Sequence, residues 1–108
     1  MDDKRNHFRL QYPPPERPSI EIAGNKYEVF DLSEGGVRFD CGPTFRPEPK
    51  TPIQAKITFK DGAICLVRGN VLRFDADKRH LIILLTVGVP YPKMMEEHRR
   101  ILQKYKKD

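Results

Sequence analysis

Two arginines near the N-terminus, Arg5 and Arg9, are spaced as R-x-x-x-R. A planar guanidinium group binds a phosphate through two parallel N–H···O contacts, and the same fork fits the O6/N7 edge of guanine. Its flat face also stacks on a nucleobase. The pair therefore suits a ligand that carries both phosphates and guanine rings, although a chain with 20 lysines and arginines also places such pairs on its surface by chance.

A second motif, D-x-S-x-x-G, is formed by Asp31, Ser33 and Gly36. A carboxylate can accept hydrogen bonds from the ring N1–H and the exocyclic amine of guanine, and a serine hydroxyl can donate or accept. Gly35 and Gly36 permit a positive φ and a close approach of the backbone to a ligand. The alternative is a tight turn in which Asp31 and Ser33 bond nearby backbone amides. Because the two motifs occur together and in this order, we interpret them as two halves of one binding site.

The elements that must position these motifs are mostly β-strands. Apolar residues alternate with polar ones in several short runs, which is the period of half-buried strands. Gly24-Asn25 and Asp61-Gly62 are hairpin signals, and Gly69 predicts a bulge or a barrel corner in a long strand. A closed, mostly antiparallel barrel is expected because closure hides the strand edges. The expected strands cover 19–22, 27–32, 37–39, 55–60, 63–74 and 80–89.

The chain is expected to form one domain in three parts, because 108 residues is a common domain size. Residues 1–12 are polar and basic, which predicts a flexible arm without core residues. The barrel is expected over 13–90. In 91–106 the apolar residues recur at helical spacing, with acids in the first half and bases in the last turn, so this segment is expected to be an amphipathic C-terminal helix.

Composition narrows the class of protein further. A formal net charge of +5 favours anionic partners. Because the charged N-terminus lacks the apolar region of a signal peptide, we expect a cytoplasmic protein in which Cys41 and Cys65 are free thiols. The longest apolar run, 81–85, is too short for a membrane span.

The histidines and potential nucleophiles do not indicate an enzyme. His7, His80 and His98 are scattered along the chain and form no metal-ligand set. No Ser/His/Asp or Cys/His arrangement can be argued from the sequence. We therefore expect no catalytic residues, no metal and no cofactor.

The two motifs, and the longer segment D-L-S-x-G-G-V-x-F over 31–39, resemble those of the PilZ domain family of bacterial cyclic di-GMP receptors. The resemblance covers roughly the whole chain, including a G-x-V segment over 69–71, and departs from the family pattern only at the end of the last strand, over 86–90. It implies a mainly β fold: a small six-stranded antiparallel barrel with a flexible N-terminal arm and a C-terminal α-helix.

The resemblance also implies roles for individual residues. The two arginines would hold phosphates and guanine edges, and the Asp-Ser-Gly segment would cradle a guanine. Lys4 occupies a position that in the family influences whether one nucleotide or a stacked pair binds. The implied cyclic di-GMP site comprises Arg5, Arg9, Asp31, Ser33 and Gly36, with Lys4, Gly35 and Arg73 as further candidates.

The function implied is that of a non-enzymatic receptor, which relays cyclic di-GMP binding through ordering of residues 1–12 to a downstream protein in motility, biofilm or virulence control. Two alternatives remain open. One is a small basic barrel that binds RNA or single-stranded DNA, although Phe39, Phe59 and Phe74 alternate as core residues rather than as an open stacking face. The other is a protein adaptor that acts without a ligand. For the receptor itself we expect no DNA binding.

Overall fold

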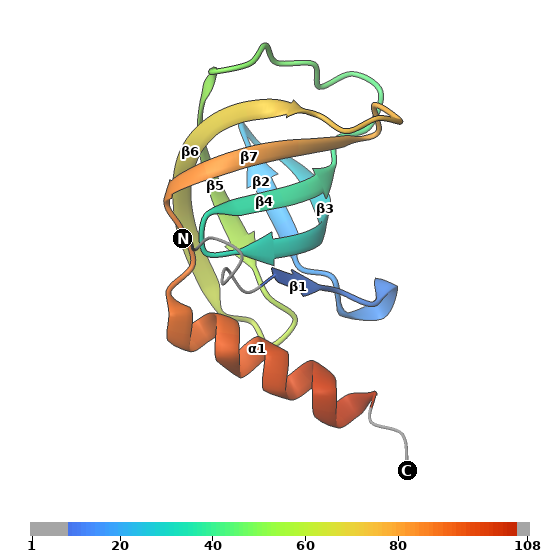
Figure 1. Ribbon diagram of the computed structural model, residues 1–108, viewed down its shortest axis with the longest axis vertical. Coiled ribbons are helices and arrows are strands. Elements are labelled where there is room, and N and C mark those ends of the chain that lie inside the picture. Colours follow the sequence, from blue (N-terminus) through green and yellow to red (C-terminus); the bar gives the residue numbers. More distant parts are fainter. Residues whose placement is uncertain (1–8, 106–108) are drawn as a thin grey trace, which may run out of the picture.

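The computed structural model of the protein describes residues 9–105 and consists of a β-barrel with an α-helix at one end (Figure 1). All strand pairings are antiparallel, and β3, β2, β5, β6, β7 and β4 follow one another around a ring that the β3–β4 pairing closes. A further strand, β1, adjoins β3. The expected six-stranded barrel with a C-terminal helix is confirmed. The strands are β1 (Arg9–Gln11), β2 (Ser19–Ile22), β3 (Asn25–Ser33), β4 (Gly36–Asp40), β5 (Pro52–Thr58), β6 (Ile64–Phe74) and β7 (His80–Val87), and the helices are the 3₁₀ segment η2 (Pro14–Glu16) and α1 (Tyr91–Lys104).

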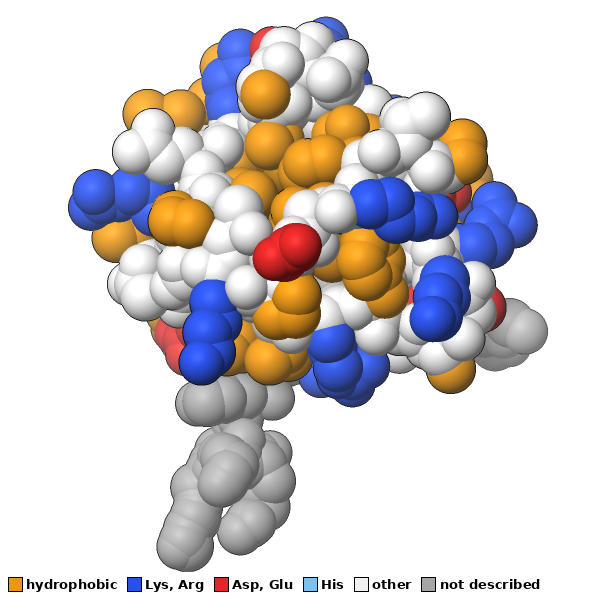
Figure 2. Space-filling view, turned by 90° about the horizontal axis from the view of Figure 1, so that it is seen from above, with side chains coloured by type: hydrophobic (Ala, Val, Ile, Leu, Met, Phe, Trp, Pro, Cys, Tyr) orange, Lys and Arg blue, Asp and Glu red, His pale blue; other side chains and the backbone are white. Residues whose placement is uncertain are grey.

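The barrel interior is filled by the inward-facing half of each alternating strand. One buried side chain from each ring strand is Ile20, Val29, Phe39, Ile57, Val71 and Leu81. Helix α1 lies across one end of the barrel (Figure 1), where Met94 and Ile101 join the core. The opposite end shows apolar side chains at its centre with lysine and arginine side chains around them (Figure 2). No helix within residues 9–105 is long and apolar enough to cross a membrane.

Glycines shape the barrel at turns and at one bulge. Gly62 has a φ of +93° in the Asp61-Gly62 hairpin turn, as expected. The first hairpin turns one residue earlier than the sequence indicates, because Ala23 and Gly24 both take positive φ and β3 already begins at Asn25. Gly69 lies at a register shift between β6 and β7, and a Cβ at this position would overlap the carbonyl oxygen of Leu84. The predicted bulge at Gly69 is therefore confirmed, and it allows β7 to approach β6 closely.

The N-terminal segment contributes more to the fold than its polarity indicates. Residues 9–11 form β1, and Leu10 and Tyr12 are buried members of the core. The expectation that residues 1–12 lack core residues is therefore wrong at these two positions, because β1 alternates and turns one side inward. Residues 1–8, which include Lys4 and Arg5, lie outside the described residues, and the flexibility of this part stays a prediction.

Candidate ligand-binding site

The β3–β4 hairpin carries the D-x-S-x-x-G motif. Ser33 ends β3 and pairs with Gly36, which begins β4. The Ser33 hydroxyl donates to the Gly36 carbonyl oxygen at 3.5 Å. The motif thus occupies a strand end and a tight turn, as the sequence predicts. Neither Gly35 nor Gly36 takes the positive φ that glycine permits.

The space around these glycines differs between the two positions. A Cβ on Gly36 would lie 3.4 Å from the carbonyl oxygen of Ile83 in β7, which is at the edge of ordinary van der Waals contact. A Cβ on Gly35 would meet nothing within 4 Å. A side chain at Gly36 would therefore touch the neighbouring strand, whereas Gly35 leaves the outer side of the turn open.

Strand β1 brings Arg9 to this hairpin. In the β1–β3 register Arg9 pairs with Ser33, and Gln11 pairs with Asp31. Arg9 and Gln11 are exposed while Leu10 points into the core, so Arg9 lies on the same outer side of the barrel as the motif. One half of the R-x-x-x-R pair is thus placed beside the D-x-S-x-x-G segment, while Arg5 and Lys4 fall outside the described residues.

These residues line one hollow of about 640 Å³ on the outer surface of the barrel. Its volume is in the range of small-molecule sites. Aliphatic side chains from β6 and β7 contribute to its lining, among them Leu72 and Leu84, which are 38% and 50% exposed. Guanidinium groups come from three different strands. The lining residues are Arg9, Asp31, Ser33, Gly35, Gly36, Val37, Arg38, Leu72, Arg73, Asp75, Ile82 and Leu84.

Arg38 is a member of this site that the sequence analysis missed. Its Nε and Nη2 atoms both lie 2.9 Å from Oδ2 of Asp31, which is its partner in the β3–β4 register. The Asp31 side chain is only 7% exposed, so the ion pair satisfies a carboxylate that water barely reaches. Among residues 9–105, no hydrogen bond reaches Oδ1 of Asp31. The signal was present in the outward alternation of β4, in which Arg38 faces the same side as the motif.

The Arg38 guanidinium extends the polar contacts to the turn between β6 and β7. Its Nη1 lies 3.4 Å from Oδ2 of Asp75, and the same oxygen is 2.9 Å from Nδ1 of His80. Burial would raise the pKa of Asp75, but contacts with Asp77 and His80 outweigh burial and lower it. The ligand atoms of Asp75, Asp77 and His80 lie within 4.8 Å of one another, a grouping that sequence spacing did not reveal. The nearby Arg38 opposes a cation at this place.

The sequence indicates that three phenylalanines are core residues rather than an open stacking face. Phe39 and Phe59 are buried inside the barrel, which confirms the expectation for these two. Phe74 is partly buried and lies under the Arg46 guanidinium, 4.9 Å from the ring centre. None of these three rings lines the 640 Å³ hollow. Cys41 and Cys65 are free thiols, as expected.

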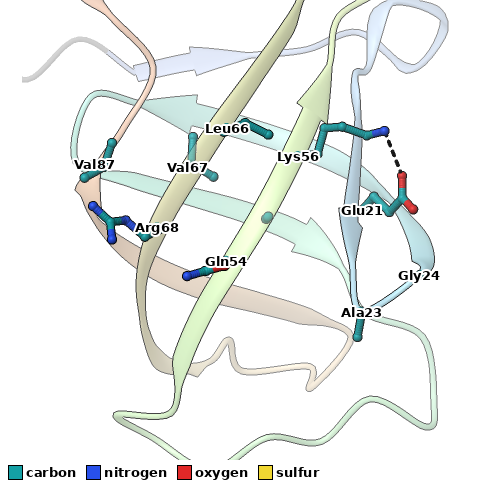
Figure 3. Close-up of a pocket in the computed structure, with 10 residues that line it drawn as sticks. Glu21, Ala23, Gly24, Gln54, Lys56, Leu66, Val67, Arg68 and Val87 are labelled. Atoms are coloured by element: carbon teal, nitrogen blue, oxygen red, sulfur yellow. Dashed lines mark ion pairs between the residues drawn. The ribbon is translucent and has the colours of Figure 1, made fainter.

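A second hollow, of about 490 Å³, lies over β2, β5 and β6 (Figure 3). Its lining includes the exposed side chain of Leu66, together with Arg68 and the ion pair between Lys56 and Glu21. None of the candidate ligand-binding residues Arg9, Asp31, Ser33, Gly35, Gly36 and Arg73 lines this second hollow. The motif residues therefore converge on the first hollow only, among the residues that the structure describes.

Comparisons with known proteins agree with the barrel. A family model described as PilZ domain matches residues 3–107. A search of the curated proteins finds no match. Among solved structures, one titled "Structure of Bacillus subtilis Inhibitor of motility (MotI/DgrA)" has a TM-score of 0.68 at 12% sequence identity, and the alignment covers 97% of this chain and 55% of that chain. The chain thus spans about half the length of that protein, and a likeness at this identity concerns the fold alone.

Proposed function

Because the chain belongs to the PilZ domain family, we propose that it is a non-enzymatic receptor for the second messenger cyclic di-GMP. The observation that carries the proposal is the register of β1 on β3. It holds Arg9 beside Ser33 and Asp31 at the edge of a hollow that is large enough for a nucleotide. In this role the protein needs no cofactor and no catalytic residues.

The chemistry of the hollow supports this ligand. Arg9, Arg38 and Arg73 bring positive charge and hydrogen-bond forks toward the phosphates and the guanine edges. The exposed aliphatic surface of Leu72 and Leu84 offers a place for the flat face of a base. Arg5 would reach the ligand from the segment before β1, as it does in the family motif.

Asp31 would hold the Watson–Crick edge of a guanine. Its Oδ2 is held by Arg38, so the side chain is already oriented before the ligand arrives. The remaining oxygen can accept from the guanine N1–H or its exocyclic amine. Ser33 and the open backbone at Gly35 would complete the contact on the turn side.

The output of the receptor is proposed to be a change at the N-terminal arm. Ligand phosphates would draw Arg5 toward Arg9 and order the residues that precede β1, which alters a surface read by a downstream protein. A cytoplasmic location suits a second messenger of this kind. The neighbouring solved structure is titled as an inhibitor of motility, and a motility partner is one of the possibilities to test alongside biofilm and virulence proteins.

Calorimetric titration of the chain with cyclic di-GMP tests this function. We expect saturable binding, and Arg9→Ala and Asp31→Ala should each weaken it by at least about 1.5 kcal/mol, the scale of a charged hydrogen bond. Arg99→Ala is the matched control, because Arg99 is an exposed arginine on α1 that does not line the hollow.

Two results would count against the proposal. A folded protein that shows no binding in the tens of micromolar would refute it. A protein that ignores the dinucleotide but binds single-stranded RNA with a steep salt dependence would favour the nucleic-acid alternative.

A further inference from the structure

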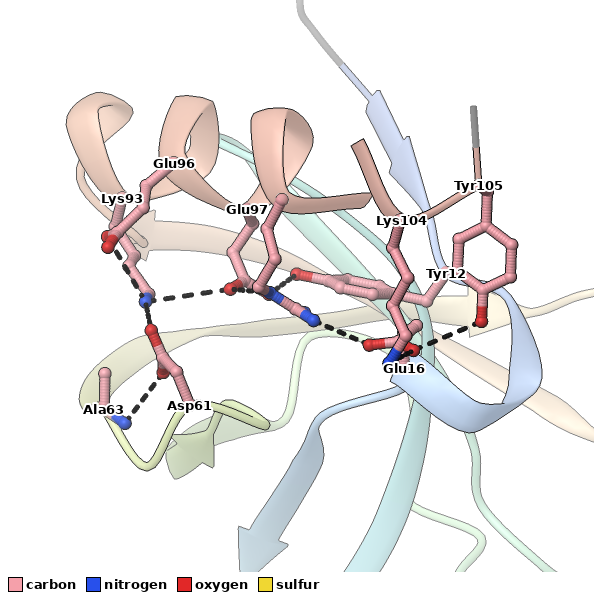
Figure 4. A network of polar contacts seen from close by, with 10 residues as sticks. Tyr12, Glu16, Asp61, Ala63, Lys93, Glu96, Glu97, Lys104 and Tyr105 are labelled. Atoms are coloured by element: carbon pink, nitrogen blue, oxygen red, sulfur yellow. Dashed lines mark hydrogen bonds and ion pairs between the residues drawn. The ribbon is translucent and has the colours of Figure 1, made fainter. Parts of the chain in front are cut away.

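A polar network ties the start of the chain to α1 (Figure 4). Glu97 of α1 is fully buried, and its Oε1 accepts hydrogen bonds from the Tyr12 hydroxyl at 2.9 Å and from Nη2 of Arg100 at 3.2 Å. Glu16 of η2, which is 2% exposed, accepts from Nη1 of Arg100 at 2.6 Å and from the Tyr105 hydroxyl at 3.1 Å. Two residues that follow β1 are thus bonded to the helix at the opposite end of the chain.

The network is costly to open. A buried carboxylate needs charged or polar partners, because leaving it unpaired incurs a desolvation penalty. If Tyr12 moved away, Glu97 would lose its neutral donor. It would keep Lys93, whose Nζ lies 3.7 Å from Oε2, and Arg100, whose guanidinium is shared with Glu16. Burial and the Glu97 carboxylate also raise the pKa of Tyr12, so its hydroxyl remains protonated and able to donate. The position of Tyr12 and the docking of α1 therefore support one another.

Strand β1 directly precedes Tyr12 in the chain. It has three residues and pairs with β3 alone, so its own ladder contributes few hydrogen bonds. The side chains of Leu10 and Tyr12 are buried in the core, and those of Arg9 and Gln11 are exposed. Holding Tyr12 in place consequently sets the direction in which Arg9 points, which is toward the 640 Å³ hollow.

We propose that Tyr12 and Glu97 are positioning residues for the ligand site: they hold β1, and with it Arg9, against Asp31 and Ser33. This inference rests on the proposed binding of cyclic di-GMP at that site. By thermodynamic reciprocity, a ligand that engages Arg9 and the β3 strand end also strengthens the docking of α1. The C-terminal helix is then part of the response to the ligand.

The test compares Tyr12→Phe with Tyr91→Phe. The first variant keeps the buried ring and removes only the hydroxyl that bonds Glu97. Tyr91 is a 53% exposed tyrosine on α1, the helix that carries Glu97. If the anchor sets the fraction of chains with β1 in place, Tyr12→Phe should weaken cyclic di-GMP binding by about threefold or more, and Tyr91→Phe should leave it unchanged.

Hydrogen exchange separates positioning from general loss of stability. Without ligand, the amides of β1 should exchange at least about fivefold faster in Tyr12→Phe, while those of β5 keep their rate, since local opening is independent of global unfolding. With saturating cyclic di-GMP, α1 of the wild type should exchange more slowly, and Tyr12→Phe should lose most of this effect. A purely structural tyrosine would not change the ligand-dependent difference.

The failure of this inference is distinguishable from failure of the proposed function. Wild-type binding with unchanged affinity and unchanged β1 exchange in Tyr12→Phe overturns the positioning role and leaves the receptor function intact. Absence of wild-type binding refutes the receptor function. In that case the exchange of β1 alone decides whether Tyr12 anchors the strand, and an unchanged rate overturns the anchor as well.

Discussion

Removing the guanidinium of Arg38 should destabilise the protein through Asp31. Removing one partner of a fully buried ion pair costs about 3–5 kcal/mol, because the remaining charge is buried without a counter-charge. The Asp31 side chain is 7% exposed, but the Arg38 side chain is 32% exposed, so water would enter and reduce the penalty. We therefore expect Arg38→Met to lower the free energy of unfolding by about 1–2 kcal/mol, or the melting temperature by about 5–10 °C.

A double-mutant cycle isolates the pair. Asp31→Asn removes the buried charge and leaves Arg38 in contact with Asp75. Combined with Arg38→Met, it should restore part of the lost stability, with a coupling free energy of about 1 kcal/mol or more in urea denaturation. Arg73→Met is the control, because Arg73 is exposed and lines the same hollow without an ion pair to Asp31. A coupling below about 0.3 kcal/mol would show that Arg38 does not neutralise Asp31, and the reasoning would be wrong.

Two other perturbations follow from the packing and the network at α1. Gly69→Ala should lower the free energy of unfolding by about 3 kcal/mol or more, because its Cβ would overlap the Leu84 carbonyl oxygen, whereas Gly35→Ala should stay within about 0.5 kcal/mol in the same denaturation assay. Equal effects would contradict the bulge geometry. Hydrogen bonds from Lys104 and Arg100 lower the pKa of Glu16 from 4.5 to about 2. The ionised carboxylate therefore stabilises the fold above pH 4.5, and this contribution is lost as the pH falls from 4.5 toward 2. Glu16→Gln should flatten the pH dependence of thermal melting in this window, and a profile parallel to that of the wild type would exclude this role of Glu16.

The barrel was predictable because its signals are local. Ala55, Ile57 and Phe59 alternate with polar neighbours, and each is buried in the structure. The glycine-rich turn after Ser33 marks a hairpin by its own composition. For the same reason the candidate residues Asp31, Ser33 and Gly36 could be placed at a strand end without knowledge of any distant contact.

The missed features depend on pairing between distant segments. β1 contains only three residues, and its identity as a strand comes from the register with β3. From the sequence alone, an arginine in a strand such as Arg38 is expected to be solvated. Its ion pair follows only from the strand register, which places Asp31 opposite it. Likewise, Glu97 looks like one of many polar residues on an amphipathic helix. In the structure it is buried and accepts a hydrogen bond from Tyr12, near the other end of the chain.

The most direct test of the central claim is an NMR titration of the ¹⁵N-labelled protein with cyclic di-GMP. The account predicts the largest amide shifts at Arg9 and along the hairpin from Asp31 to Arg38, with saturation at the calorimetric affinity. Shifts that gather instead around Lys56 and Leu66, in the second hollow of Figure 3, would place the ligand elsewhere and contradict the proposed site. A spectrum that does not change at all would contradict the receptor function itself.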